Sequence, residues 1–195
     1  MSELALELAE KIEGEVRFDR YSRLLYSTDA SIYQIEPLGV VIPRHRDDVE
    51  QTVRLAAKAG VPVLPRGGGT SLAGQAVGEA VILDLSKYMN RVLELNIPER
   101  WVRVQPGIVQ DGLGAYLKLH GVRFGPETAT SNRANLGGMI GNNSAGARSL
   151  IYGKTVDNVL EVRVILADGS EAVFGPVWRQ DIESKTTGDS LEAKI

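Results

Sequence analysis

Glycine is the feature that most constrains how this chain can fold. The sequence holds 21 glycines, and 16 of them fall between Gly60 and Gly153, where they alternate with short apolar runs. Because glycine has no Cβ, loops rich in it let backbone N–H groups turn inward and approach a bound group closely. The clustering predicts that the middle of the chain holds a ligand largely through its backbone.

Composition excludes several other classes of protein. The 195 residues include 43% hydrophobic and 24% charged side chains, enough for a core of one domain or of one domain and a part. The net charge of -3 gives no basic surface for nucleic acid. The chain has no cysteine, so it carries no disulfide, thiolate metal site or cysteine-ligated iron–sulfur cluster of its own. His45 and His120 are too far apart in sequence to suggest a metal site.

The sequence shows neither the pattern of a signal peptide nor that of a membrane span. The first residues are amphipathic and acidic, which is not typical of a signal peptide, and no apolar run approaches the ~18 residues of a membrane span. We therefore expect a cytoplasmic protein without a transmembrane segment. Attachment to the periphery of a membrane through a partner remains an alternative.

Hydrophobic periodicity predicts an α+β fold. Residues 39–43, 61–64 and 80–85 have strand character, and a helix between the first two makes a βαβ unit with a right-handed crossover. An antiparallel hairpin, a helix and a second hairpin closed by Asp168-Gly169 follow, at residues 92–105, 110–120 and 158–174. Residues 21–37 have no clean period and are expected to form a covering loop. The expected fold is thus a small parallel subdomain followed by an antiparallel subdomain with helices.

The same pattern predicts the domain boundaries. Residues 1–36 form an N-terminal helix and covering segment, and residues 37–175 form the binding domain, with subdomains at about 37–90 and 91–175. Residues 176–195 are polar and are expected to be a linker or the beginning of a further region.

The first dense glycine loop lies between two predicted strands and reads PRGGGTSLAGQ, residues 65–75. Its three successive glycines favour a nest of N–H groups for phosphate oxygens, and Arg66 adds positive charge. It is not a P-loop, because no lysine follows the glycines. It is not a GxGxxG fingerprint either, because Leu72 stands where the third glycine is required. Taken alone, the triple glycine could also be a tight, mobile connection.

A second loop makes the binding interpretation stronger. Residues 135–146, NLGGMIGNNSAG, again expose backbone and offer amide and hydroxyl side chains with no charge. Two such loops favour an extended, mostly neutral nucleotide over a single phosphate.

Together the two loops carry a family resemblance. VPVLPRGGGTSLAGQAV and GPETATSNRANLGGMIGNNSAGARSLIYGKTVDNVLEVRVILADG resemble the FAD-binding domain of the p-cresol methylhydroxylase and vanillyl-alcohol oxidase superfamily. Within it, the chain is similar to FAD-linked oxidases of the D-lactate dehydrogenase and glycolate oxidase type, some of which carry an iron–sulfur module. The resemblance covers residues 21–174 and implies two α+β subdomains with FAD between them.

The resemblance also implies which residues contact the cofactor. The first loop would hold the diphosphate and the ribityl end, through Pro65, Arg66, Gly67, Gly68, Gly69, Thr70, Ser71, Gly74 and Gln75. The second region would line the flavin, through Pro126, Thr130, Ser131, Gly138, Asn142, Asn143, Ser144, Gly146 and Tyr152. Backbone groups at Val162 and Val164 would face adenine.

Some of these residues have a second interpretation. The Arg66 side chain either pairs with the diphosphate or is a solvated charge. Tyr152 either contacts the cofactor or packs at the edge of the core. Some superfamily members attach flavin covalently through a histidine where this chain has Thr70, so we expect noncovalent FAD.

The function implied by the resemblance is hydride transfer from a small 2-hydroxy acid, such as D-lactate or glycolate, to flavin. No catalytic base or metal ligand is identifiable in the sequence, and in the resembled enzymes these groups belong to a C-terminal cap domain. We therefore expect the chain to be a fragment, inactive alone, with a possible iron–sulfur module or subunit as partner. The alternatives are a non-catalytic nucleotide-binding module that needs a partner chain, or the flavin subunit of a molybdenum hydroxylase or enolpyruvyl reductase.

Overall fold

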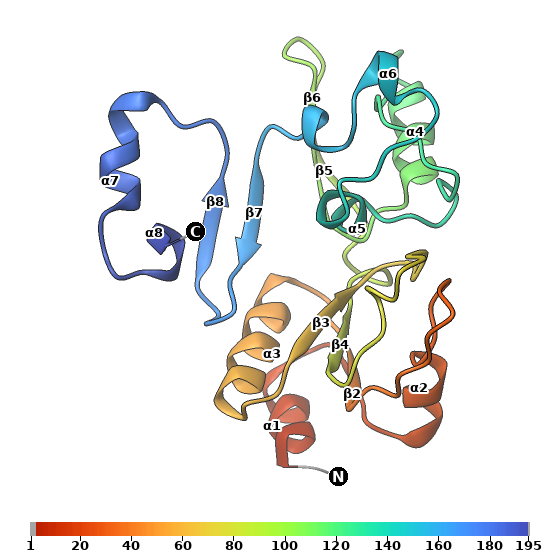
Figure 1. Cartoon of the computed structure of the whole chain (residues 1–195), viewed down its shortest axis with the longest axis vertical. Coiled ribbons are helices and arrows are strands. Elements are labelled where there is room, and N and C mark those ends of the chain that lie inside the picture. The colour runs from red at the N-terminus through yellow and green to blue at the C-terminus, as the bar shows by residue number, and fades with distance from the viewer. Residues whose placement is uncertain (1–2, 195) are drawn as a thin grey trace.

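A computed structural model describes residues 3–194 and arranges them as two lobes, one above the other, with a hairpin beside them (Figure 1). The first lobe contains a four-stranded sheet in the order β1-β2-β4-β3. Its strands are β1 (Glu15–Arg17), β2 (Gly39–Ile42), β3 (Val63–Arg66) and β4 (Val81–Asp84). β4 pairs in parallel with β2 and with β3, and β1 pairs antiparallel with β2.

The strand order refines the predicted βαβ unit. Helix α3 (Arg46–Lys58) connects β2 to β3, and the two strands are parallel as predicted. They are not neighbours, however, because β4 comes later in the chain and lies between them. β2 and β4 are consequently buried along their whole length, as their continuous apolar runs require.

Apolar side chains leave this sheet on both faces. On one face, Val41, Val81 and Leu83 pack with Leu8 of α1 (Glu3–Lys11), and α1 in turn contacts α3. Alternate residues of the same strands, such as Ile82, point to the other face. The segment that covers this second face includes α2 (Arg20–Leu25), a helix within the stretch that the sequence predicts to be a loop. The Asp19 carboxylate starts α2 by accepting the Ser22 N–H at 2.9 Å.

The second lobe begins with the predicted hairpin, β5 (Val92–Asn96) and β6 (Trp101–Val104). Helices α4 (Gln110–Lys118), α5 (Leu136–Gly141) and α6 (Ser149–Tyr152) follow, with a 3-10 turn at Val156–Asn158. Leu113, Leu117, Leu136 and Met139 form its core, so the apolar piece of the second glycine loop is a short helix that packs on α4. This packing fixes one end of the second loop.

The last part of the chain returns to the first lobe. Strands β7 (Val162–Ile165) and β8 (Glu171–Phe174) form a separate two-stranded sheet, followed by a 3-10 turn at Arg179–Asp181 and helices α7 (Ile182–Thr186) and α8 (Leu191–Lys194). Two arginines of α3 hold this hairpin. Arg46 donates to the Glu171 carboxylate at 2.8 Å, and Arg54 donates to the Gly169 carbonyl at 3.2 Å. No helix within residues 3–194 is long and apolar enough to cross a membrane.

Glu15 connects the edge strand β1 to the residues that follow β4. Its carboxylate accepts hydrogen bonds from Lys87, from Tyr88 at 2.6 Å and from Arg17. These bonds, first of all the one from Lys87, lower the pKa of Glu15 from 4.5 to about 2. A lowered pKa means that the ionised form stabilises the fold, fully above about pH 5 and progressively less as the pH falls toward 2.

We expect Glu15→Gln to lower the free energy of unfolding at neutral pH and to have a much smaller effect near pH 2, where the wild-type carboxylate is about half protonated. Urea unfolding between pH 7 and pH 2 measures this difference. Glu10→Gln, on the exposed side of α1, is the matched control. A difference between wild type and Glu15→Gln that stays constant over this range would contradict the account.

Candidate functional site

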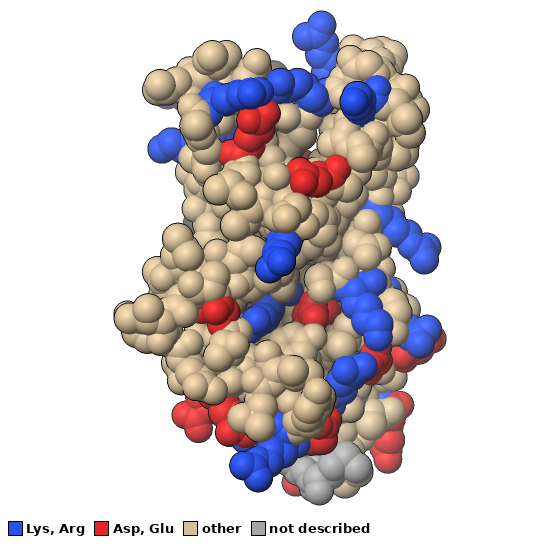
Figure 2. Space-filling model, turned by 90° about the vertical axis from the view of Figure 1, so that its right-hand side faces the viewer, with Lys and Arg blue, Asp and Glu red and all other residues tan. Residues whose placement is uncertain are grey.

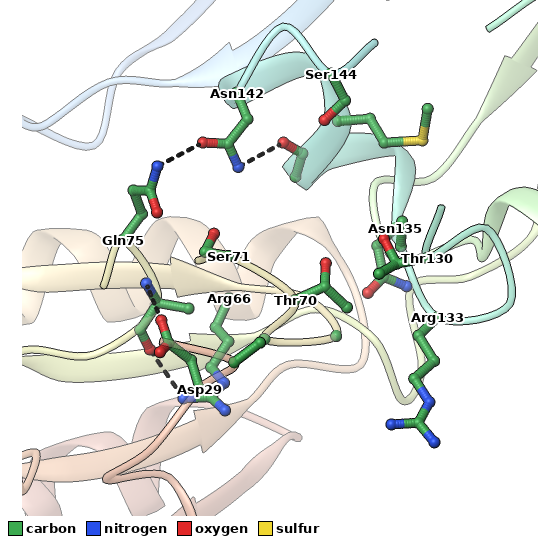
Figure 3. Close-up of a pocket in the computed structure, with 18 of the residues that line it drawn as sticks. Asp29, Arg66, Thr70, Ser71, Gln75, Thr130, Arg133, Asn135, Asn142 and Ser144 are labelled. Atoms are coloured by element: carbon green, nitrogen blue, oxygen red, sulfur yellow. Dashed lines mark hydrogen bonds between the residues drawn. The ribbon is translucent and has the colours of Figure 1, made fainter. Parts of the chain in front are cut away.

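A pocket of about 1310 Å³ lies between the two lobes. Three stretches of chain supply most of its wall. They are residues 25–30, which begin at the end of α2, residues 65–76, which begin at the end of β3, and residues 128–145 around α5. Figure 3 shows the first loop facing Asn142 and Ser144 of the second across the open space. The carboxyl end of β3 therefore delivers the triple glycine directly to the gap between the lobes, as an edge of a parallel sheet commonly does.

The first loop offers a run of free donors to this pocket. Among residues 3–194, no backbone or side-chain acceptor takes the N–H groups of residues 67–71. Gly69 has a φ of +64°, a conformation that glycine adopts without strain and that turns successive N–H groups toward one side. Consecutive N–H groups of this kind fit an anion such as a diphosphate.

The absence of side chains at Gly67 and Gly68 lets the two lobes meet. A Cβ on Gly67 would lie 2.5 Å from the Asn135 side-chain oxygen, and one on Gly68 would lie 2.4 Å from the Arg133 carbonyl oxygen. Asn135 is 4% exposed, and its amide nitrogen donates to the Gly107 carbonyl. Its Oδ1 is buried without a hydrogen-bond partner among the described residues. The first loop and the start of α5 are thus in direct contact.

The position of the Arg66 side chain fits neither of the two interpretations of this residue from the sequence. Its guanidinium donates to three backbone carbonyls, those of Thr28 at 2.7 Å, Ala76 at 2.8 Å and Tyr26 at 3.1 Å, and lies over the Tyr26 ring at 5.3 Å. It is neither directed at the pocket as a phosphate ligand nor a solvated charge. Burial lowers the pKa of Arg66.

Tyr26 extends this network into the sheet. Its hydroxyl donates to the carboxylate of Asp84, the last residue of β4, at 2.6 Å, and that carboxylate also accepts from Ser86. Burial raises the pKa of Tyr26, and the hydrogen bond to Asp84 raises it further. The segment that covers the sheet is therefore fixed to the strand that precedes the second lobe.

The second loop is held by its own polar side chains. The Asn143 side-chain oxygen accepts the Val156 N–H at 3.0 Å, which supports the positive φ of Asn143, and buried Thr155 donates to the Ser144 carbonyl at 2.7 Å. Asn142 accepts a hydrogen bond from Gln75 at 3.3 Å, which crosses from one loop to the other (Figure 3). Asn142 and Gln75 thus link the two walls of the pocket.

Most of the residues proposed for the first loop line the pocket, and several of those proposed for the second do not. The pocket wall includes Pro65, Arg66, Gly67, Gly68, Gly69, Thr70, Ser71, Gln75, Thr130, Gly138, Asn142 and Ser144. It does not include Gly74, Pro126, Ser131, Asn143, Gly146, Tyr152, Val162 or Val164. Several of the second set support the wall instead: the Pro126 carbonyl accepts from Gln110, and a Cβ on Gly146 would collide with the Glu127 carbonyl.

The sequence interpretation did not include residues 25–30 in the site. Asp29 is a carboxylate of the pocket wall that accepts the N–H groups of Ser31 at 2.8 Å and Ala76 at 3.3 Å. Leu25 lies at the end of the unexpected helix α2. Only the short polar run around Asp29, within a stretch without periodicity, gave any sign of this role.

The fold and the pocket define a class of protein. Two α+β lobes, with glycine loops from each facing one large cavity, form the FAD-binding fold of the p-cresol methylhydroxylase type, which confirms the predicted fold. A family described as "FAD binding domain" matches residues 37–175, and the chain belongs to this family. Its cofactor is FAD.

Known relatives agree with this assignment. The chain is 48% identical over 190 residues to a D-2-hydroxyglutarate dehydrogenase of Pantoea ananatis, covering 96% of this chain and 19% of that protein. It is 34% identical to the glycolate oxidase subunit GlcD of Bacillus subtilis, covering 88% and 37%. A solved structure of an alkyldihydroxyacetonephosphate synthase superposes with a TM-score of 0.80 at 25% identity, covering 90% of this chain and 35% of that one. The chain thus spans about a fifth of the first of these relatives and little more than a third of the other two.

The residues present fit FAD on structural grounds. The five free N–H groups of residues 67–71 suit a diphosphate, and the 1310 Å³ cavity exceeds the usual ~300–1,000 Å³ of a small-ligand pocket. Apolar atoms form the larger part of the wall, backbone, amide and hydroxyl groups form most of its polar part, and Asp29, Arg66 and Arg133 are the charged residues of the lining. This is the chemistry expected for a long ligand with one anionic centre.

We expect Gly68→Ala to destabilise the protein by about 1–3 kcal/mol, because the new methyl group would meet a backbone carbonyl that cannot move independently. Gly114→Ala, inside α4 with open space around the new atom, is the matched control and should instead stabilise by about 0.5–1 kcal/mol. Thermal unfolding of both variants measures the difference. Equal melting temperatures for the two variants would contradict the proposed contact between the lobes.

Proposed function

We propose that this chain is the FAD-binding part of a flavoprotein that oxidises a small 2-hydroxy acid, and that it holds FAD noncovalently between its two lobes. The observation that carries the proposal is that residues 67–71, whose N–H groups have no acceptor within residues 3–194, line a large cavity in a chain of the FAD binding domain family. When bound, FAD supplies the redox chemistry. Residues 37–175 form the binding domain, with subdomains at about 37–90 and 91–175.

The residues around the pocket support the proposal of noncovalent binding. The chain has no cysteine, and His45 and His120 do not line the cavity. His45 lies beside Glu13 and Asp48 at the start of α3, and His120 packs against Tyr116 at the end of α4. At the position of the superfamily's attachment histidine stands Thr70, whose hydroxyl does not form such a bond. The first loop therefore binds and orients the cofactor through hydrogen bonds.

The substrate class is supported by the relatives. They are named for D-2-hydroxyglutarate and glycolate, and both names denote small 2-hydroxy acids. The pocket wall offers Asp29, Arg66 and Arg133 as its charged groups, and none of them is an evident base for a hydroxyl group. We propose that the groups which bind and deprotonate the substrate belong to a further domain or a partner subunit, and that this chain alone binds FAD without oxidising the acid. We further propose an iron–sulfur module or subunit as a separate partner.

Flavin titration tests the proposal. We expect the purified chain to quench FAD fluorescence with saturation, and to release all flavin into the supernatant after denaturation in acid or detergent. Flavin that stays with the precipitated protein would contradict noncovalent binding. A chain that binds no added FAD would contradict the proposed function itself.

Gly138→Ala provides a variant that separates binding from folding. Gly138 lies in α5 at the pocket wall, and a Cβ there would meet no protein atom within 4 Å. The added methyl group should leave the melting temperature equal or slightly higher, since alanine favours a helix over glycine, and should weaken FAD binding by occupying cofactor space. Unchanged FAD affinity at full stability would mean that this face of α5 does not contact the cofactor.

A further inference from the structure

Arg66 lies under the glycine loop without facing the ligand space. Figure 3 shows its side chain directed away from Asn142 and Ser144, below Thr70 and Ser71. The loop folds back over it, because a Cβ on Gly69 would lie 2.6 Å from the guanidinium. Three of its five N–H groups are already bound to carbonyl oxygens of the chain.

No carboxylate within residues 3–194 forms an ion pair with Arg66 at 4.0 Å or less. Its direct partners are the carbonyls of Tyr26, Thr28 and Ala76, which carry no net charge. Two carboxylates act on it from further away, Asp29 in the pocket wall and Asp84 at the end of β4. Neither carboxylate touches Arg66, so its positive charge is balanced only from a distance and lies just behind the loop.

We propose that Arg66 is a partly buried cation that gives the pocket its preference for flavins carrying a diphosphate, through its electric field and not through contact. The inference rests on the proposed function, because the anion it selects is the diphosphate of FAD. Because the Arg66 side chain is partly shielded from solvent, its field is screened less than that of a fully exposed charge. The N–H groups set the position of the diphosphate, and Arg66 adds a favourable potential at that place.

The other arginine of the pocket wall offers the competing explanation. Arg133 is exposed, and its side chain is directed away from Thr70 and Asn135 (Figure 3). If a solvent-exposed cation supplied the charge by direct contact, Arg133 would be that residue. Separate substitutions of the two arginines distinguish the two explanations: an electric field from Arg66 behind the loop, or a direct contact from Arg133 at the rim of the pocket.

The test is to measure the dissociation constants of FAD and riboflavin by flavin fluorescence for the wild type, Arg66→Gln, Arg66→Lys, Arg133→Gln and Arg103→Gln. Both Arg66 variants lose the fork that binds three carbonyls, but only Arg66→Lys keeps the charge. Arg103→Gln removes a charge from the β5–β6 hairpin and is the matched control. Circular dichroism and thermal unfolding verify the fold of each variant.

We expect Arg66→Gln to lower the ratio of the riboflavin to the FAD dissociation constant about tenfold, and Arg66→Lys to keep most of that ratio. The ratio should also fall with added salt in the wild type, and less so in Arg66→Gln. Arg133→Gln and Arg103→Gln should leave it close to the wild-type value. These results would assign the diphosphate preference to the charge of Arg66.

Asp29→Asn gives an independent measurement should Arg66→Gln fail to fold. Removing this negative charge leaves Arg66 less compensated, so the variant should bind FAD more tightly relative to riboflavin. Because Asp29 itself lines the pocket, this increase reports the net charge behind the loop, and Arg66→Lys, which keeps the positive charge, shows whether Arg66 supplies it.

Three results would overturn the inference. Equal losses of FAD and riboflavin affinity in both Arg66 variants would make Arg66 a scaffold residue only. A lowered ratio in Arg133→Gln instead would assign the charge to the rim. An unchanged or lowered ratio in Asp29→Asn would contradict the field. In each of these three cases the wild type still binds FAD, so only the inference about Arg66 fails. A wild type that binds neither flavin would contradict the proposed function.

Discussion

The close contact between the first glycine loop and the segment before α5 sets the distance between the two lobes. Gly67 and Gly68 bring the backbone of one lobe against Asn135 and the Arg133 carbonyl of the other, where no larger residue fits. The cavity exists because the lobes touch at this place and diverge beyond it. Its width follows from the fit of glycine backbone against the buried Asn135 side chain and the Arg133 carbonyl, and so close a fit varies little.

Around this contact the pocket is built with few charges. Asn142 and Gln75 link the walls through neutral amides, and Asn143 and Thr155 use their polar groups to hold the second loop. Neutral groups in a cavity cost less to leave without partners than charges do. The site can therefore be preformed at modest cost before the cofactor arrives.

The local parts of this structure could be predicted from the sequence. Glycine spacing located two of the three stretches that line the pocket. Periodicity located β2, α3, β3, β4, the β5–β6 hairpin and α4, because these signals depend on neighbours along the chain. The position of β4 inside the sheet, the role of Asp29 and the direction of the Arg66 side chain depend on contacts between distant residues. Tyr26 and Asp84, for example, are 58 positions apart, and nothing in either segment alone indicates that they meet.

The order of strands in the first lobe has a consequence for how the chain folds. β2 can pair with β1 at once, but its other edge and the inner edge of β3 have no partner until β4 arrives between them. Two apolar strand edges thus remain open during synthesis, and such edges attract other chains. Pairing over long loops is also slow, so the arrival of β4 is expected to limit the folding rate of this lobe. The covering helix α2, packed beside β2, shields one face of the unfinished sheet in the meantime.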